Sequence, residues 1–367
     1  MSLQPRPEIA DLKVSQHGGL NYAELEAMGI SPDEVLDFSV SSNPHGPPPG
    51  LVAATKDARI DRYPDSEASE LRHRLGRRLR VDPRNIIVGS GSTELIRLAA
   101  LAYLGRDDKA LIIEPTFGEY EVACHIMGAA IVRQRLSDRD GFALDMDMTQ
   151  ELMRRHRPRV VFLCNPNNPT GSYLSRQEFQ RLLAAAPDSL VILDEAYIAF
   201  VPETWPSTDM IEDNNLLILR SMTKDYTLAG LRLGYAVAHQ EIVDTLRRVC
   251  PPWNVNAVAQ QAGVFALQQE EFSRRTRIQV SQAKAYLVRE LTRLGLRPLP
   301  SRTNFFLVEV GDASDWRRRL LKKGILVRDC TSFGLPHHVR IAPRDFMACS
   351  RLVAAIKELQ REEPDAG

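Results

Sequence analysis

Residues 190–224 read LVILDEAYIAFVPETWPSTDMIEDNNLLILRSMTK, and this stretch decides the fold. It contains two short apolar runs, Leu190–Asp194 and Leu216–Arg220, and polar residues follow each of them. Short apolar runs that end at polar residues are typical of strands buried on both faces of a sheet. Lys224 comes just after the second run. The stretch therefore predicts two central strands whose ends carry reactive side chains.

The same pattern continues on both sides of this stretch. Further buried strands are predicted at Ile86–Gly89, Ala110–Ile113, Ile131–Arg133, Val160–Cys164 and Tyr235–Ala238. Helical periodicity lies between several of the strands, at Thr93–Leu104, Tyr120–Met127, Met148–His156 and Arg176–Ala185. Strands that alternate with helices predict an α/β fold with a mostly parallel, doubly wound sheet.

The pattern changes after about residue 255. Helices are predicted there at Ala257–Leu267, Phe272–Leu294, Trp316–Lys323 and Arg344–Arg361, and strands at Asn304–Val310, Ile325–Arg328 and Val339–Ile341. This mixture indicates a smaller α+β domain. We expect a large domain over residues 46–255, and a small domain that joins residues 1–45 to residues 256–367.

Composition narrows the class of protein. The chain has 367 residues, and 44% of them are hydrophobic, which is typical of a globular protein with a core. Its formal net charge of zero gives no electrostatic reason to expect nucleic acid or a membrane as partner. The basic clusters at residues 72–78 and 317–319 are interpreted as solvated helix faces. Five cysteines without a Cys-x-x-Cys pair indicate neither a disulfide framework nor a metal site, so we expect reduced thiols in a cytoplasm. We expect no signal peptide and no membrane helix.

Polar residues follow five of the predicted strands, and the carboxyl ends of parallel strands are where ligands bind. Ser90-Gly-Ser-Thr93 precedes a helix and is either a phosphate-binding turn or an ordinary helix cap. Asp194 ends an apolar strand, so its carboxylate needs a partner such as a protonated pyridine, a buried arginine or a metal. Lys224 is either a nucleophilic amine in a closed site or a surface lysine.

Several motifs occur together. They are Arg62-Tyr-Pro64, Asn165-Pro-Asn-Asn-Pro-Thr-Gly171, Asp194-x-x-Tyr197, Ser221-x-Thr-Lys224 and Leu228-Ala-Gly-Leu-Arg-Leu-Gly234. In this order, across residues 36–345, the chain resembles the class I/II aminotransferases, which depend on pyridoxal phosphate (PLP). The resemblance implies an aspartate-aminotransferase-like fold of type I and PLP as the cofactor.

The resemblance also implies roles for individual residues. Lys224 would hold the cofactor as a Schiff base and move protons, while Asp194 would keep the pyridine nitrogen protonated. Tyr197 and Asn168 would bind the phenolic oxygen of the ring, and Phe117 would stack on the ring. The phosphate would be held by Gly91, Ser92, Thr93, Ser221, Thr223 and Arg232. Tyr63 would reach the phosphate of a neighbouring subunit, which implies a homodimer.

Two subfamilies are the nearest in motif. His17-Gly-Gly19, Leu36-Asp-Phe-Ser39 with Asn43-Pro-x-Gly46, and Arg328-Asp-Cys330 resemble the threonine-phosphate decarboxylases of cobalamin biosynthesis. Decarboxylation of L-threonine O-3-phosphate is therefore the first expectation, and the alternative is amino transfer to 2-oxoglutarate of the histidinol-phosphate aminotransferase type. A phosphorylated amino acid would be bound by His17, Gly18, Asn168, Arg328 and Arg340, the last of which matches the arginine that grips the substrate carboxylate.

Two other classes of function remain open from sequence. One is a catalytically silent PLP-fold binding protein, which the intact Lys224, Asp194 and Tyr197 disfavour. The other is a nucleotide-binding α/β enzyme that uses Ser90–Ser92 for phosphate, which the missing Walker lysine disfavours.

Overall fold

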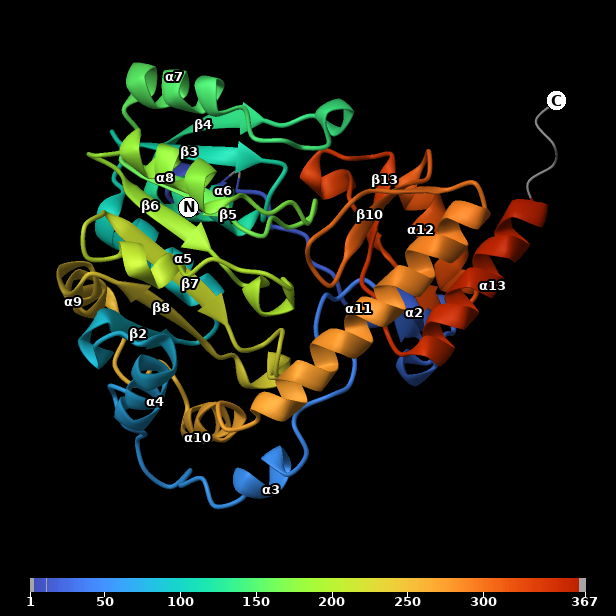
Figure 1. The fold of residues 1–367 in the computed structure, drawn as a ribbon, viewed down its shortest axis with the longest axis horizontal. Coiled ribbons are helices and arrows are strands. Elements are labelled where there is room, and N and C mark those ends of the chain that lie inside the picture. Colours follow the sequence, from blue (N-terminus) through green and yellow to red (C-terminus); the bar gives the residue numbers. More distant parts are fainter. Residues whose placement is uncertain (1–2, 11, 363–367) are drawn as a thin grey trace.

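A central sheet dominates the computed structural model, which describes residues 3–10 and 12–362 (Figure 1). Within these residues the sheet has seven strands. In spatial order they are β2 (Ile86–Gly89), β8 (Gly234–Ala238), β7 (Leu216–Ser221), β6 (Leu190–Asp194), β5 (Val160–Cys164), β3 (Lys109–Glu114) and β4 (Ala130–Arg135). All neighbouring pairs are parallel except the two that involve β8, which runs antiparallel to β2 and β7. The mostly parallel sheet is confirmed.

Helices cover both faces of this sheet. The core on one face includes residues of α5 (Ser92–Tyr103), α6 (Glu119–Met127) and α9 (Gln240–Val249). The core on the other face includes residues of α4 (Ser69–Leu79), α7 (Met146–His156), α8 (Arg176–Ala184) and α10 (Ala257–Ala266). Successive strand residues point to opposite faces, so Phe162 and Val161 enter different cores and both must be apolar. This explains the continuous apolar runs of the sequence.

A second, smaller body follows in the chain. Three helices, α11 (Glu270–Arg293), α12 (Ala313–Lys322) and α13 (Phe346–Glu362), share an apolar core with a four-stranded antiparallel sheet. The strands of that sheet are β12 (Arg328–Asp329), β13 (His338–Ile341), β10 (Phe306–Glu309) and β9 (Arg297–Pro298).

Residues 22–37 of the N-terminal segment, which include α2 (Tyr22–Met28), pack against this smaller body. By contrast, α1 (Pro7–Ala10) contacts α6, and α3 (Leu51–Ala54) contacts α10. β1 (Leu36–Asp37) pairs in parallel with β11 (Ile325–Leu326). Leu25 of α2 packs on Leu321 and Leu326, and Glu24 forms an ion pair with Arg317 at 2.6 Å. Figure 1 shows α2 beside α12.

Some boundaries differ from the sequence prediction. The predicted strand Ile325–Arg328 is wrong as a single unit, because Val327 separates β11 and β12, which belong to different sheets. Helices α4 and α9 had no predicted bounds. The division into residues 46–255 and the remainder stays a prediction. The alanines of α10 pack in the large core, and this packing favours placing the boundary after α10.

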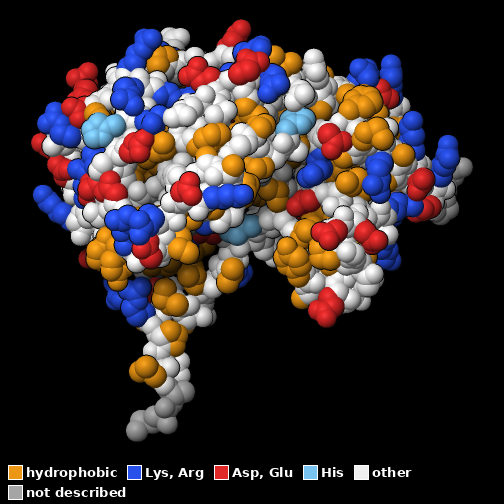
Figure 2. All heavy atoms as spheres, turned by 90° about the horizontal axis from the view of Figure 1, so that it is seen from below, with side chains coloured by type: hydrophobic (Ala, Val, Ile, Leu, Met, Phe, Trp, Pro, Cys, Tyr) orange, Lys and Arg blue, Asp and Glu red, His pale blue; other side chains and the backbone are white. Residues whose placement is uncertain are grey.

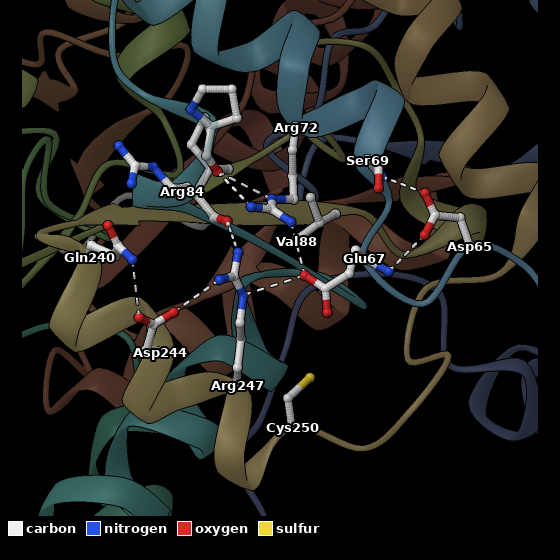
Figure 3. A network of polar contacts seen from close by, with 12 residues as sticks. Asp65, Glu67, Ser69, Arg72, Arg84, Val88, Gln240, Asp244, Arg247 and Cys250 are labelled. Atoms are coloured by element: carbon white, nitrogen blue, oxygen red, sulfur yellow. Dashed lines mark hydrogen bonds and ion pairs between the residues drawn. The ribbon is translucent and has the colours of Figure 1, made fainter.

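An ion network joins α4, β2 and α9 (Figure 3). Arg72 donates to Glu67 at 2.8 Å and to the carbonyl of Pro83, at the turn that leads into β2. Arg247 lies 3.4 Å from the same carboxylate of Glu67 and donates to Asp244 at 3.0 Å. The solvated-face interpretation is therefore wrong for Arg72, whose side chain is only 13% exposed. Its guanidinium instead helps to fix β2, the strand that leads into the Ser90–Ser92 turn.

Among the described residues, no helix is both long enough and apolar enough to cross a membrane.

Candidate active site

A cavity of about 240 Å³ lies beyond the carboxyl ends of the sheet, between the sheet and β12–β13 of the smaller body. It collects side chains from distant parts of the chain. Ten of the predicted site residues line it: His17, Gly18, Thr93, Phe117, Asn168, Tyr197, Lys224, Arg232, Arg328 and Arg340. The expected convergence of strand ends is confirmed.

Strand geometry brings these groups together. Asp194 is the last residue of β6, and Ser221 is the last residue of β7, its parallel neighbour. Phe117 and Asn168 lie in the loops that follow β3 and β5. The Lys224 amine lies 5.7 Å from the centre of the Tyr197 ring, and the backbone carbonyl of Lys224 accepts a hydrogen bond from Asn43. The loop that carries Lys224 is thereby tied to the segment that begins at Asn43.

Small residues and hydroxyl groups form a cradle at the start of α5. Gly91, with φ of 81°, lies so close to Arg232 that a Cβ there would come within 2.6 Å of Nη2. A Cβ on Gly234 would come within 2.8 Å of the backbone nitrogen of Ser92. The hydroxyls of Ser221 and Thr223 are 2.6 Å apart. Free amides of a helix start, two hydroxyls and a guanidinium suit a phosphate group.

Asp194 is almost fully buried, with 3% of its surface exposed. The Tyr120 hydroxyl donates to its Oδ2 at 2.7 Å, and the backbone amide of Ala196 donates to Oδ1 at 2.9 Å. Burial raises the pKa of Asp194, while these two donors and the nearby Lys224 oppose that rise. Burial and Asp194 also raise the pKa of Tyr120, so its hydroxyl keeps its proton and donates. A cation beside Asp194 would stabilise its charged form.

Two arginines lie opposite each other at the small-body wall of the cavity. Arg328 and Arg340 are direct partners in the β12–β13 ladder, and they are 7% and 5% exposed. Arg340 donates to Asn168 Oδ1 and to the carbonyl of Ser39, and its Nε finds no partner among the described residues. Burial and the charge of Arg340 lower the pKa of Arg328. Two like charges that face each other across a strand pair repel each other. An anionic ligand bound in the cavity beside β12 and β13 would relieve this repulsion.

The N-terminal segment closes one side of the cavity. His17 Nε2 lies 3.0 Å from Glu119 Oε1, and the carbonyl of Gln16 accepts a hydrogen bond of 2.8 Å from Arg328. A Cβ on Gly18 would come within 2.5 Å of the Ser39 carbonyl, so a glycine is required there. His17 and Arg328 therefore line the same cavity although 311 positions separate them in the sequence.

Tyr63 does not line the cavity. It is 74% exposed and stacks on Trp253, with ring centres 4.1 Å apart. Gly91, Ser92, Asp194, Ser221 and Thr223 are also absent from the cavity wall. Gly91 lies against the wall residue Arg232, Ser92 and Thr223 precede the wall residues Thr93 and Lys224 in the chain, and the charge of Lys224 acts on Asp194.

Sequence reasoning missed three residues of this region. Glu119 and Tyr120 begin α6, for which the sequence predicted only a helix over Tyr120–Met127. Ser41 lines the cavity with a buried hydroxyl that has no partner among the described residues. The available signals were the place of α6 in the segment after β3 and the place of Ser41 shortly after Leu36-Asp-Phe-Ser39.

Comparison with known proteins assigns the chain to a family. The profile described as "Aminotransferase class I and II" matches residues 33–356. The chain belongs to this family. It is therefore an enzyme that uses PLP and has the aspartate-aminotransferase-like fold, as predicted.

Individual aminotransferase-family members resemble the chain over most of its length. A histidinol-phosphate aminotransferase of Symbiobacterium thermophilum is 36% identical over 88% of this chain and 90% of its own. The crystal structure of L-threonine-O-3-phosphate decarboxylase from Porphyromonas gingivalis is 30% identical, with a TM-score of 0.78 over 88% of this chain and 99% of its own. Histidinol-phosphate aminotransferase from Sinorhizobium meliloti in complex with PLP is 23% identical, with a TM-score of 0.88 over 99% of both chains, which shows the shared fold.

The residues of this aminotransferase-family chain fit PLP. The cradle around Gly91 has donors for a phosphate and is too tight for a Cβ. Asp194 offers a buried carboxylate for a protonated ring nitrogen, and Lys224 lines the cavity. Nothing in these contacts conflicts with the cofactor of the family.

Replacement of Tyr120 by Phe should shift the pH dependence of this enzyme. The change removes the hydroxyl donor to Asp194, so the pKa of Asp194 rises further. The family resemblance implies that Asp194 acts as a carboxylate, and on that expectation activity is present above its pKa and lost as pH falls through it. The acid limb of the kcat profile should therefore move to higher pH, with a loss of about tenfold on that limb. Tyr22→Phe, at an exposed tyrosine, is the control. An unchanged acid limb in Tyr120→Phe would contradict the role of the hydroxyl.

Proposed function

We propose that the chain is a PLP-dependent aminotransferase that acts on a small phosphorylated amine of the histidinol-phosphate type. The buried pair Arg328 and Arg340, at the wall of the cavity that Lys224 also lines, is the observation that carries this proposal. Two guanidiniums suit a substrate with a phosphate and a co-substrate with carboxylates. The relatives named above as histidinol-phosphate aminotransferases support the reaction type.

We further propose that the family roles of the cofactor residues apply here. The cradle of Gly91, Ser92, Thr93, Ser221, Thr223 and Arg232 would hold the cofactor phosphate. Bound PLP supplies an electron sink for the electrons of a broken bond at the substrate α-carbon. Asp194 holds a negative charge at the ring nitrogen, and Tyr120 stabilises that charge by its hydrogen bond. Lys224 binds the cofactor and then moves a proton at its Nζ. Tyr197 and Asn168 orient the ring, and Phe117 covers one of its faces.

The substrate side of the cavity would bind anions. Arg328, with His17 and the backbone of Gly18, is the proposed site of the substrate phosphate. Arg340 is the proposed site of a carboxylate. Its present partner, the Asn168 side-chain oxygen, would have to share the guanidinium with that carboxylate. This division lets one cavity accept a phosphorylated amine in one half of the reaction and a dicarboxylate in the other.

A second candidate is decarboxylation of L-threonine O-3-phosphate, which the sequence motifs favoured. The two adjacent guanidiniums could hold the carboxylate and the phosphate of such a substrate together, and the decarboxylase neighbour at 30% identity supports this reading. We place it second because the curated relatives are named for amino transfer. Family membership supports neither a silent binding protein nor a nucleotide-binding enzyme.

The reaction itself is tested by product analysis of the holoenzyme. With L-histidinol phosphate and 2-oxoglutarate, the proposal predicts stoichiometric glutamate formation. With O-phospho-L-threonine alone, it predicts no release of carbon dioxide. Rapid carbon dioxide release, with no glutamate from the first mixture, would replace the first candidate by the second.

Arg328→Ala should weaken the binding of phosphorylated substrates much more than that of unphosphorylated ones. Loss of a charged hydrogen bond to phosphate costs roughly 1.5–3 kcal/mol, so KM for the phosphorylated substrate should rise about tenfold to a hundredfold. KM for L-histidinol, which lacks the phosphate, should change little. Arg84→Ala is the matched control, because Arg84 is exposed and pairs with Asp82. Equal losses on both substrates would remove Arg328 from the phosphate site.

We also propose the homodimer that the family resemblance implied. Tyr63 and Trp253 form an exposed aromatic stack, and Val52 and Ile60 are exposed hydrophobic residues of the same part of the chain. Figure 2 shows the N-terminal segment projecting from the body, and its Leu3 and Val14 are almost fully exposed. A second copy would bury these groups and bring Tyr63 to the partner's cofactor phosphate. The cytoplasmic location stays a prediction.

A further inference from the structure

Glu119 is a buried carboxylate beside a cavity that should take anions. It is the first residue of α6 and only 7% exposed. Its Oε1 lies 3.0 Å from His17 Nε2, and its Oε2 accepts a hydrogen bond of 2.5 Å from Arg97 Nη2. The proposed cofactor contacts use none of these three side chains. A negative charge near an anion site weakens anion binding, so its presence there calls for an explanation.

The surrounding backbone leaves His17 little freedom. A Cβ on Gly118 would come within 2.7 Å of Ser15 Oγ, so the chain before His17 lies directly on the start of α6. The Gln16 carbonyl is held by Arg328 at 2.8 Å, and the Gly19 amide donates to Ser39 Oγ at 2.8 Å. The segment of residues 15–19 is thus fixed at both ends, and the remaining freedom is the rotation of the His17 ring.

Glu119 removes that freedom. A carboxylate next to Nε2 fixes the proton on that nitrogen and sets the orientation of the ring, as carboxylates do for histidines in metal and catalytic sites. The other ring nitrogen, Nδ1, is then available to a ligand. Arg97 holds the opposite oxygen of Glu119, and its own Nη1 is buried with no partner among the described residues. Arg97 offsets the charge of Glu119, and His17 lies at the other carboxylate oxygen.

We propose that Glu119, with Arg97 behind it, is a positioning residue that orients His17 toward the phosphate of the substrate. His17 then uses one ring nitrogen for Glu119 and the other for the phosphate. This inference rests on the proposed function, because it requires a phosphorylated substrate. It makes the Arg97–Glu119–His17 chain a determinant of the preference for phosphorylated over unphosphorylated amines.

The test replaces Glu119 by Gln in the holoenzyme. KM for L-histidinol phosphate should rise about tenfold, the usual effect of losing one charge-assisted hydrogen bond, while kcat stays close to that of the wild type. The kinetics with L-histidinol should not change. Glu121→Gln, on the same helix at a side chain that is 44% exposed and pairs with Arg133, should behave like the wild type. A fall in kcat, or equal losses with both substrates, would overturn the positioning role.

A double-mutant cycle with His17→Asn distinguishes positioning from general damage. His17 is half exposed, so its replacement should not impair folding. The two single variants should raise KM for the phosphorylated substrate to similar extents. The double variant should have the same KM as His17→Asn alone. Additive losses would show that Glu119 does not act through His17.

Inorganic phosphate separates this inference from the proposed reaction. Its dissociation constant from the holoenzyme, measured by calorimetry, does not depend on which reaction the enzyme catalyses. A dissociation constant about tenfold higher in Glu119→Gln supports the inference even if the wild type transfers no amino group. An unchanged constant overturns it even if amino transfer is confirmed.

Discussion

The buried carboxylate of Asp194 is the constraint on which the site depends. An ionised carboxylate inside a protein is unfavourable unless donors or a cation stabilise it. Here the backbone of Ala196 and the hydroxyl of Tyr120 supply two hydrogen bonds, yet burial still raises the pKa of the group. A protonated ring nitrogen of the cofactor would complete the arrangement, as proposed above. The charge at the end of the apolar strand β6 would then be fully stabilised when the cofactor is bound.

The opposite wall of the cavity carries buried positive charges instead of a buried negative one. Arg328 and Arg340 are ladder partners, and each is satisfied in part by backbone carbonyls rather than by carboxylates. Their charges remain available for anions. The smaller body and the N-terminal segment meet at this wall, because Gln16 accepts a hydrogen bond from Arg328 and Ser39 accepts one from Arg340. Residues from two distant parts of the chain therefore form one anion-binding wall.

Local patterns predicted the strands and most helices, because the strands are buried on both faces and their residues are apolar throughout. The motifs predicted which residues meet at the strand ends. Three features depend on tertiary contacts that no local pattern encodes. They are the split of β11 from β12, the inward Arg72 that a charge pattern assigns to the surface, and the pairing of Glu119 with His17 across 102 positions. The motif around Asp194 likewise gave no indication of Tyr120, whose hydroxyl reaches the carboxylate from helix α6.

The central claim is that one closed site, organised around Asp194, binds PLP through Lys224. Borohydride reduction of the holoenzyme followed by peptide mapping tests it most directly, because reduction makes the bond between cofactor and lysine permanent. The account predicts that the tagged peptide carries the modification on Lys224 and that the visible absorbance of the cofactor disappears. A tag on another lysine, with Lys224 unmodified, would contradict the account.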